Sequence, residues 1–336
     1  EKKEYDMRLI ALLIPAVLFA LPSSGADRWK VNPDGGITWE VSADIPHHDH
    51  IEMSGLKVSS VLRYGVEADG EFSLDRSLVW PMLRTVPNNT HASLMRHLDW
   101  NVLEMVNIGG TRPWGEKVTD LTLDGKLTVR SILQSVLGPV ALCRTIFPST
   151  SHPSLCEKYD IKNCGDRKML VEIPDIESIA RTPKEMGTEG VYKIISSLKG
   201  GTAILGPGEE ISFSAFYAAC KDSQGVEALD IDEELSLREA LVGELWSSLS
   251  LETPDTTINR MFAFAKIRAA ESIYDTRGGL MHGPGGESYY AAIWANDQAE
   301  YINPFFPFLG YGKGCGSALN SFMHFARYMK IGRAHV

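Results

Sequence analysis

The spacing of apolar residues changes near residue 230 and divides the chain into two parts. Between residues 27 and 230, short runs rich in β-branched and aromatic residues alternate with clusters of Gly, Pro, Asn and Asp. Such runs are typical of strands, and many in succession predict a large antiparallel β-sandwich domain. Strands do not alternate with helices, which argues against a Rossmann-type sheet. The predicted strands are residues 57–66, 71–80, 118–123, 126–133, 168–173, 190–196 and 210–219.

One hairpin in this part is indicated by its turn. Asp124 and Gly125 separate two segments of alternating pattern, residues 118–123 and 126–133. The Asp-Gly pair supplies the positive φ angles of a type I′ turn. We therefore predict that these two segments pair directly.

After residue 230 the apolar residues recur at helical spacing. Leu237, Leu241, Leu245 and Leu249 repeat every four positions, which places them on one helix face. This spacing predicts a connecting helix within residues 231–252.

A second helix is predicted after Thr253, which can cap it, with Pro254 at the first helical position. Its apolar stripe is expected to face a core, and the helix is expected to end near Thr276, before Gly278. The stripe consists of Ile258, Met261, Phe262, Ala265, Ala269 and Ile273.

Two further helical segments follow. One is expected to start near Ala295 and stop before Pro304 or Pro307, and the other to run from Ser317 to about Met329. The glycine-rich residues 310–316 between them do not match a phosphate-binding loop and are expected to form a plain loop. Residues 253–330 are therefore predicted to form an all-α domain.

The composition is that of a soluble globular protein with an acidic balance. Of the residues, 44% are hydrophobic and 23% charged, and the formal net charge is −10. Nucleic-acid binding needs clustered Lys and Arg, so a nucleic-acid partner is not expected. The chain shows neither a G-x-S-x-G elbow nor an H-E-x-x-H zinc helix, and we expect no cofactor.

The first 26 residues resemble a secretory signal with a few residues upstream of it. Met7 and Arg8 provide a start with a positive charge, residues 9–21 an apolar run, and residues 24–26 a small-residue cleavage site. The run is too short to span a membrane, since a transmembrane helix needs about 20 apolar residues. These features predict export to the periplasm or the extracellular space.

The chain contains five cysteines. An exported protein can pair some of them, and Cys156 with Cys164 is the expected bridge. Their spacing does not match a zinc site, so no metal is expected there.

A histidine cluster lies at residues 47–50, followed by Glu52. In an extended segment His48, His50 and Glu52 share one face, because successive side chains alternate. A polar strand near a domain interface is the first interpretation, a substrate contact the second, and a metal site the third.

An aromatic and polar run follows the glycine-rich residues 278–286. Pyranose rings bind against aromatic faces, and their hydroxyls bind to carboxylates and amides. The run therefore predicts contacts to a carbohydrate. Its candidate residues are Glu287, Tyr289, Tyr290, Trp294, Asn296 and Asp297.

This run resembles the aromatic, Trp, two residues, Asp pattern of the six-hairpin, (α/α)6-barrel glycosidases of the glucoamylase-like superfamily. The resemblance covers about residues 250–330 by motif and the rest by domain order. It implies a β-sandwich domain followed by an all-α domain that begins an (α/α)6 toroid, truncated here. Residues 331–336 resemble a non-native tail, so the chain is expected to be a fragment.

The resemblance also implies roles for the candidate residues. Asp297 would accept hydrogen bonds from the innermost sugar, or act as the general acid as in some relatives. Trp294 would stack on that sugar, while Asn296 stands where the pattern often has Arg. Glu287 could pair with Asp297 as a catalytic carboxylate, although the main acid and base of these families come from later loops, outside this chain.

The function expected from this resemblance is hydrolysis of a glycosidic bond by an exported glycoside hydrolase that uses carboxylate acid/base catalysis. The alternatives are a glycoside phosphorylase on the same scaffold and a non-catalytic carbohydrate-binding protein. A polysaccharide lyase is disfavoured by the order of the two domains.

Overall fold

The computed structural model describes residues 28–41, 46–85, 92–287 and 293–329. The predicted signal, Tyr289, Tyr290 and the predicted tail lie outside the described residues.

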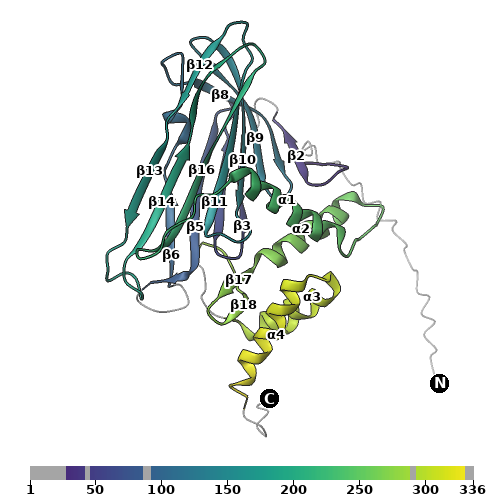
Figure 1. Cartoon of the computed structure of the whole chain (residues 1–336). Helices are drawn as coiled ribbons and strands as arrows, with labels where there is room; N and C mark the ends of the chain where they lie inside the picture. Colours follow the sequence, from purple (N-terminus) through teal and green to yellow (C-terminus); the bar gives the residue numbers. More distant parts are fainter. Residues whose placement is uncertain (1–27, 42–45, 86–91, 288–292, 330–336) are drawn as a thin grey trace, which may run out of the picture.

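Most of the described chain is antiparallel sheet arranged in two layers (Figure 1). One layer is a nine-stranded sheet of order β1-β2-β8-β9-β10-β11-β16-β14-β13. Its strands are β1 (Lys30–Val31), β2 (Ile37–Glu40), β8 (Trp114–Leu123), β9 (Leu127–Ser135), β10 (Gly138–Pro148), β11 (Ser154–Asn163), β16 (Glu210–Lys221), β14 (Tyr192–Lys199) and β13 (Ile176–Arg181).

Two smaller sheets complete the β-rich part. The four-stranded sheet has the order β3-β4-β5-β6, and the three-stranded sheet has the order β15-β12-β7. Their elements are β3 (His47–Ser54), β4 (Ser59–Val66), β5 (Phe72–Arg84), β6 (Ser93–Leu98), the 3-10 helix η1 (Val102–Met105), β7 (Asn107–Ile108), β12 (Met169–Ile173) and β15 (Gly201–Leu205).

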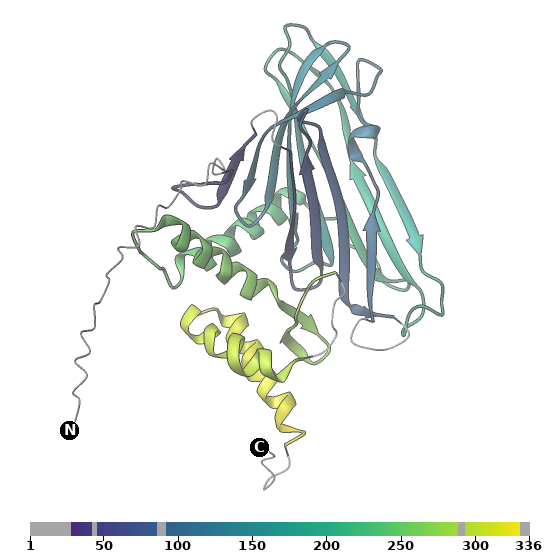
Figure 2. The ribbon, with the colours of Figure 1, turned by 180° about the vertical axis from the view of Figure 1, so that it is seen from behind.

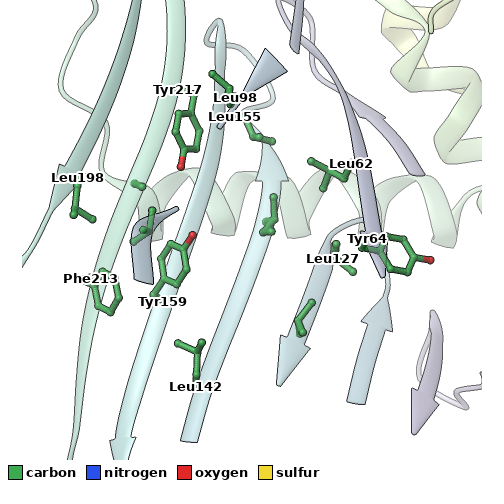
Figure 3. Packing of buried hydrophobic residues seen from close by; sticks show 14 of the residues in the cluster. Leu62, Tyr64, Leu98, Leu127, Leu142, Leu155, Tyr159, Leu198, Phe213 and Tyr217 are labelled. Atoms are coloured by element: carbon green, nitrogen blue, oxygen red, sulfur yellow. The ribbon is translucent and has the colours of Figure 1, made fainter. Parts of the chain in front are cut away.

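The core is formed by alternate residues of these strands, because successive side chains point to opposite faces of a sheet. Leu62 of β4 and Leu142 of β10 are both almost fully buried. Figure 3 shows their side chains within the same apolar cluster, together with Tyr159 and Tyr217. The burial of these residues favours association of the sheets.

The predicted hairpin forms, but its turn differs from the prediction. Strands β8 and β9 pair with Leu123 opposite Leu127, so residues 124–126 connect them. Only Gly125 of these three has a positive φ, of 89°, whereas a type I′ turn needs positive φ at both central residues. The predicted type I′ turn is therefore wrong.

The prediction of an all-α domain that starts an (α/α)6 toroid is wrong. A β-hairpin, β17 (Ile273–Thr276) with β18 (Gly279–His282), separates the helices, and the described chain as a whole is mainly antiparallel sheet. The hairpin forms because Gly279 adopts a φ of 95° in its turn. The backbone N–H of Asp275 also donates to the carbonyl of Leu56, at 2.8 Å.

The helices lie at one end of the sandwich (Figures 1 and 2). Helices α1 and α2 are closest to the strands, while α3 and α4 lie beyond them near the hairpin. The helical elements are α1 (Ile231–Ser247), α2 (Thr256–Glu271), the π-helix η2 (Asp297–Ile302), α3 (Asn303–Leu309) and α4 (Gly312–Ala326).

The buried face of α1 differs from the predicted leucine stripe. Leu237 and Leu249 are exposed, whereas Arg238 and Val242 are buried. The face that meets the sandwich contains charged residues that pair there, and a stripe of apolar residues alone does not identify it. The buried residues of α1 are Ile231, Glu234, Arg238, Val242 and Leu245.

The predicted stripe of α2 is likewise only partly right. Ile258 and Met261 are exposed, while Lys266 and Glu271 are buried. The helix is capped by Asp255, whose side chain accepts hydrogen bonds from the backbone of two residues in the first turn. It ends at Glu271 and not near Thr276.

The predicted loop at residues 310–316 is mostly helix. Gly310 ends α3 in the left-handed conformation, with a φ of 70°, and α4 begins at Gly312. Gly314 lies so close to Phe306 that a β-carbon there would overlap its ring. The glycines therefore serve helix termination and close packing.

The predicted bridge between Cys156 and Cys164 is wrong. Both cysteines are free thiols. Cys156 lies within β11, and Cys164 directly follows that strand. At about 3.3 Å per residue, an extended segment holds their Cα atoms roughly 26 Å apart, and a disulfide needs less than about 7 Å.

Candidate functional site

The second part of the chain is joined to the four-stranded sheet through Glu52 of β3. Its Oε2 lies 3.1 Å from Nη2 of Arg268 on α2, and its Oε1 accepts a hydrogen bond from the hydroxyl of Ser59, at 2.9 Å. The same Oε1 accepts from the backbone N–H of Gly286, at 2.9 Å. Glu52 therefore positions the glycine-rich loop that leads to the aromatic run.

This loop, residues 283–287, is held at both ends. At its start, Nε2 of Gln298 donates to the carbonyl of His282, at 3.2 Å, and lies 3.1 Å from Nδ1 of the same residue. At its end, Gly286 is bound by Glu52. A segment of five residues is at most about 18 Å long. The π-helix, which binds the start of the loop, and the four-stranded sheet, which binds its end, are therefore close to each other.

Glu287 lies on the outer face of the four-stranded sheet. It forms an ion pair with Arg63 of β4. Arg63 also donates to Asp75 of β5, at 3.2 Å. Nδ1 of His97 on β6 lies 3.1 Å from the hydroxyl of Ser77 and 3.9 Å from Oδ2 of Asp75. Side chains from three adjacent strands thus surround the carboxylate.

These contacts decide the charge of Glu287. The hydrogen bond from Arg63 lowers the pKa of Glu287, against the opposing effect of burial, and a hydrogen bond from Ser77 acts in the same direction. The carboxyl is therefore ionised at neutral pH and cannot serve as a general acid there. Its Oε1 is buried, with no hydrogen-bond partner assigned among the described residues.

Asp297 begins the π-helix η2, and Trp294 precedes it. The backbone N–H of Gln298 donates to the carbonyl of Trp294, at 3.1 Å. The indole is 47% exposed, and Asn296 is exposed beside it with its amide 3.4 Å from Glu300. Trp294 and Asn296 are thus both solvent-exposed at the start of the helix.

His282 connects Asp297 to the glycine-rich loop. Burial lowers the pKa of His282 to about 4, while the negative charge of Asp297 opposes that shift. The imidazole is therefore neutral at neutral pH. Oε1 of Gln298 beside it is buried with no hydrogen-bond partner in the described part of the chain. Two buried acceptors, on Glu287 and Gln298, thus flank one loop.

The histidines of β3 lie at the edge of the same outer face. His48 and His50 line a hollow of about 440 Å³ with Arg63 and Asp75. The segment is extended as predicted, but the side chains have different partners. Nε2 of His48 lies 3.1 Å from Glu67, whereas Glu52 binds Arg268. Within the described ranges, no group of three or more His, Cys, Asp or Glu side chains could hold a metal ion.

The sequence did not single out Arg63, Asp75, Ser77 and His97. They come from three strands that only the fold brings together. The available signal was alternation: residues 75 and 77 lie two apart in a predicted strand and so share a face. Nothing in the sequence indicated that this face would meet Glu287.

No family model matches the chain, and no curated protein is similar to it in sequence. One solved structure that it resembles is described as "Putative kojibiose phosphorylase from human microbiome". The TM-score is 0.49 and the identity 8%, over 83% of this chain and 47% of that one. The chain thus spans about half the length of that protein, and a likeness at this level does not assign it to a family. No helix within the described residues has the length and apolar character that crossing a membrane requires.

Proposed function

We propose that this chain is part of a carbohydrate-processing enzyme and binds a sugar unit at the glycine-rich loop. The observation that carries the proposal is a pair of buried acceptors, Oε1 of Glu287 and Oε1 of Gln298, at the two ends of that loop, for which the described part of the chain supplies no hydrogen-bond partner. Trp294 supplies an exposed aromatic face close by in the chain. Acceptors for hydroxyls and a ring for the apolar face of a pyranose are what a sugar site needs.

Each candidate residue has a defined role in this proposal. Trp294 stacks on the sugar, and Asp297 with Asn296 accepts or donates hydrogen bonds to its hydroxyls. Glu287, ionised by its contact with Arg63, accepts a hydrogen bond from a hydroxyl or from water. The group that protonates the leaving oxygen is a different residue, because an ionised carboxylate has no proton to give.

We propose hydrolysis as the reaction, in preference to phosphorolysis. Phosphate would need cations that are not already neutralised. In the hollow on the outer face, Arg63 is paired with Asp75 and Glu287, and His48 faces Glu67. We also propose that the protein is exported, as expected from its N-terminal residues.

Binding of oligosaccharides by calorimetry, over a panel that differs in sugar and linkage, tests the site. Trp294→Ala and Asp297→Asn are expected to weaken binding about 5- to 150-fold, since loss of a stacking ring or a charged acceptor costs about 1–3 kcal/mol. Trp114→Ala is the matched control, because Trp114 is also exposed, at 51%, but lies on β8. Absence of binding to the whole panel, or equal binding by all variants, would contradict the proposed site.

Turnover of a bound oligosaccharide separates the reactions. Release of a free sugar in phosphate-free buffer supports hydrolysis. A sugar phosphate formed only when phosphate is added would identify a phosphorylase. Tight binding with neither product, in a protein that includes any sequence beyond residue 336, would favour a non-catalytic carbohydrate-binding protein.

A further inference from the structure

A second hollow of about 270 Å³ is lined by residues 97–103 and by side chains of β5, β8, β10 and β11. Its polar lining includes Arg76, Glu116, Arg144 and Tyr159 and also Asp75 and His97, which lie near Glu287; Trp294 and Gln298 do not line it. The lining includes Phe72, Arg76, Trp100, Glu116, Arg144 and Tyr159. A volume at the lower end of small-molecule sites suits one small ligand.

Arg76, which lines this hollow, belongs to a buried ion pair. Arg76 binds both carboxylate oxygens of Glu157, with Nη2 at 3.1 Å from Oε2, and their side chains are 7% and 0% exposed. The hydroxyls of Tyr159 and Tyr217 donate to the same carboxylate. Figure 3 shows these two hydroxyls pointing toward one another within the core.

A second ion pair, from neighbouring strands of the nine-stranded sheet, lines the same hollow. Arg144 binds both oxygens of Glu116, with Nη2 at 2.9 Å from Oε2, and its guanidinium lies 5.1 Å from the ring centroid of Phe72. Among the described residues, Glu116 accepts from two of the nitrogens of Arg144. A guanidinium has five N–H donors, so Arg144 has donors left for a ligand.

Stability alone does not account for two ion pairs inside an apolar sandwich. Desolvating such charges costs several kcal/mol per ion, and apolar replacements of similar volume are often neutral or stabilising. A hollow beside the pairs gives them a second role, because donors and acceptors that are held in fixed positions recognise polar ligands.

We propose that this cavity binds a single neutral sugar unit, as a second site beyond the glycine-rich loop. Both arginines are matched by carboxylates, so the walls favour a neutral ligand over an anion. Donors on Arg144, acceptors on Glu116 and the indole of Trp100 fit a polyhydroxylated ring with one apolar face. The site stands on its own contacts and does not require the site at Trp294.

Saturation-transfer NMR of the whole chain with glucose, galactose, mannose and xylose, each added alone, tests this site. At least one sugar is expected to receive magnetisation from the protein. Trp100→Ala, which removes the aromatic wall, and Leu103→Trp, which fills the cavity, are each expected to weaken that binding at least 10-fold. Thermal unfolding of each variant shows whether it remains folded, and Trp114→Ala is again the matched control.

The two sugar sites are separated by their variants. Sugar binding that Trp294→Ala abolishes, and that Trp100→Ala and Leu103→Trp leave unchanged, would overturn the cavity site and leave the loop site standing. Binding of inorganic phosphate in place of the sugars, or no transfer to any of the four, would also overturn it. Loss of binding only in the Trp100 and Leu103 variants would support the cavity while the loop site fails.

Discussion

Arg238 of α1 and Glu271 of α2 form an ion pair that is almost fully buried, with side chains 1% and 2% exposed. Arg238 also donates to the carbonyl of Gly125 in the β8–β9 turn, at 2.7 and 2.9 Å, and to that of Ser54. Glu271 in turn binds Arg268, at 2.5 Å. The pair therefore holds both helices on the sandwich. It also fixes the end of α2, which leads through the β17–β18 hairpin to the glycine-rich loop.

Replacing Glu271 by Gln is expected to destabilise the protein by about 3–5 kcal/mol, because it leaves Arg238 buried without a counter-charge. Urea unfolding followed by circular dichroism measures this loss. Glu40→Gln is the control, since the Lys30–Glu40 pair is 61% and 67% exposed. Exposed substitutions of this kind change stability by at most about 0.5 kcal/mol, and equal losses in both variants would contradict the role of the buried pair.

The pH dependence of stability is expected to report the burial of His282. Its pKa is about 4 in the folded protein, lowered by burial, and 6.5 is the ordinary value. The unfolded chain therefore binds more protons between these values, and stability falls as pH is lowered through that window. Between about pH 7.5 and pH 5 the loss from this residue is about 2 kcal/mol.

Urea unfolding at several pH values, compared between the natural chain and His282→Gln, isolates this contribution. The variant is expected to lack it, while His50→Gln, which alters an exposed side chain of β3, is expected to retain it. A pH slope that stays the same in His282→Gln would show that the imidazole is not held neutral by burial.

Some of the strands could be predicted from the sequence, because β-branched and aromatic alternation is local information. Residues 127–133 and 210–219 indeed lie in β9 and β16. Others, β10 and β11 among them, were not predicted. The hairpin turn was mistaken because Arg238, far along the chain, binds the carbonyl of Gly125. A turn used as an acceptor for another element does not have to follow the sequence preference for a type I′ turn.

The helical part was predicted less well for the same reason. Leucine spacing marked α1 correctly as a helix but gave the wrong buried face, because Arg238 is buried through its partners and Leu237 is not. The hairpin β17–β18 was missed because Ile273 also continued the apolar stripe of the preceding helix. Of the candidate site residues, Trp294, Asp297 and Glu287 were identified from the sequence. Arg63 could be identified only from the structure, because its contact with Glu287 depends on how the sheet and the loop pack together.

The glycine-rich loop offers a matched pair of substitutions. Gly285 and Gly286 have φ angles of 77° and 87°, so alanine strains the backbone at either position, by about 1 kcal/mol. A β-carbon at Gly285 would also lie 2.7 Å from Oε1 of Glu52, whereas at Gly286 it would meet nothing within 4 Å. Gly285→Ala is therefore expected to be the more destabilising change and the one that releases the loop.

Hydrogen exchange of the loop amides and urea unfolding distinguish the two variants. Faster exchange at residue 286 in Gly285→Ala than in Gly286→Ala is expected, because the amide of residue 286 is bound by Glu52. If both variants exchange and unfold alike, the contact with Glu52 does not hold the loop in place.

Arg63→Gln is expected to raise the pKa of Glu287 toward its ordinary value, because the hydrogen bond from Arg63 is the main cause of the lowered pKa. A lowered carboxyl pKa stabilises the folded state above the unfolded value of 4.5 and loses that effect as pH falls through the folded pKa. Both side chains are partly exposed, at 41% and 32%, so screening limits the contribution to less than about 1 kcal/mol.

Carbon-detected NMR titration of the Glu287 carboxyl measures this shift, with Arg130→Gln as the control because Arg130 pairs with Asp120 on a different sheet. Sugar binding at the loop is expected to weaken in Arg63→Gln, since Glu287 loses the contact that fixes it on the sheet. A Glu287 pKa that rises while sugar affinity stays unchanged would show that this carboxylate anchors the loop without touching the ligand. The acceptor role would then fall to Gln298 and Asp297 at the other end of the loop.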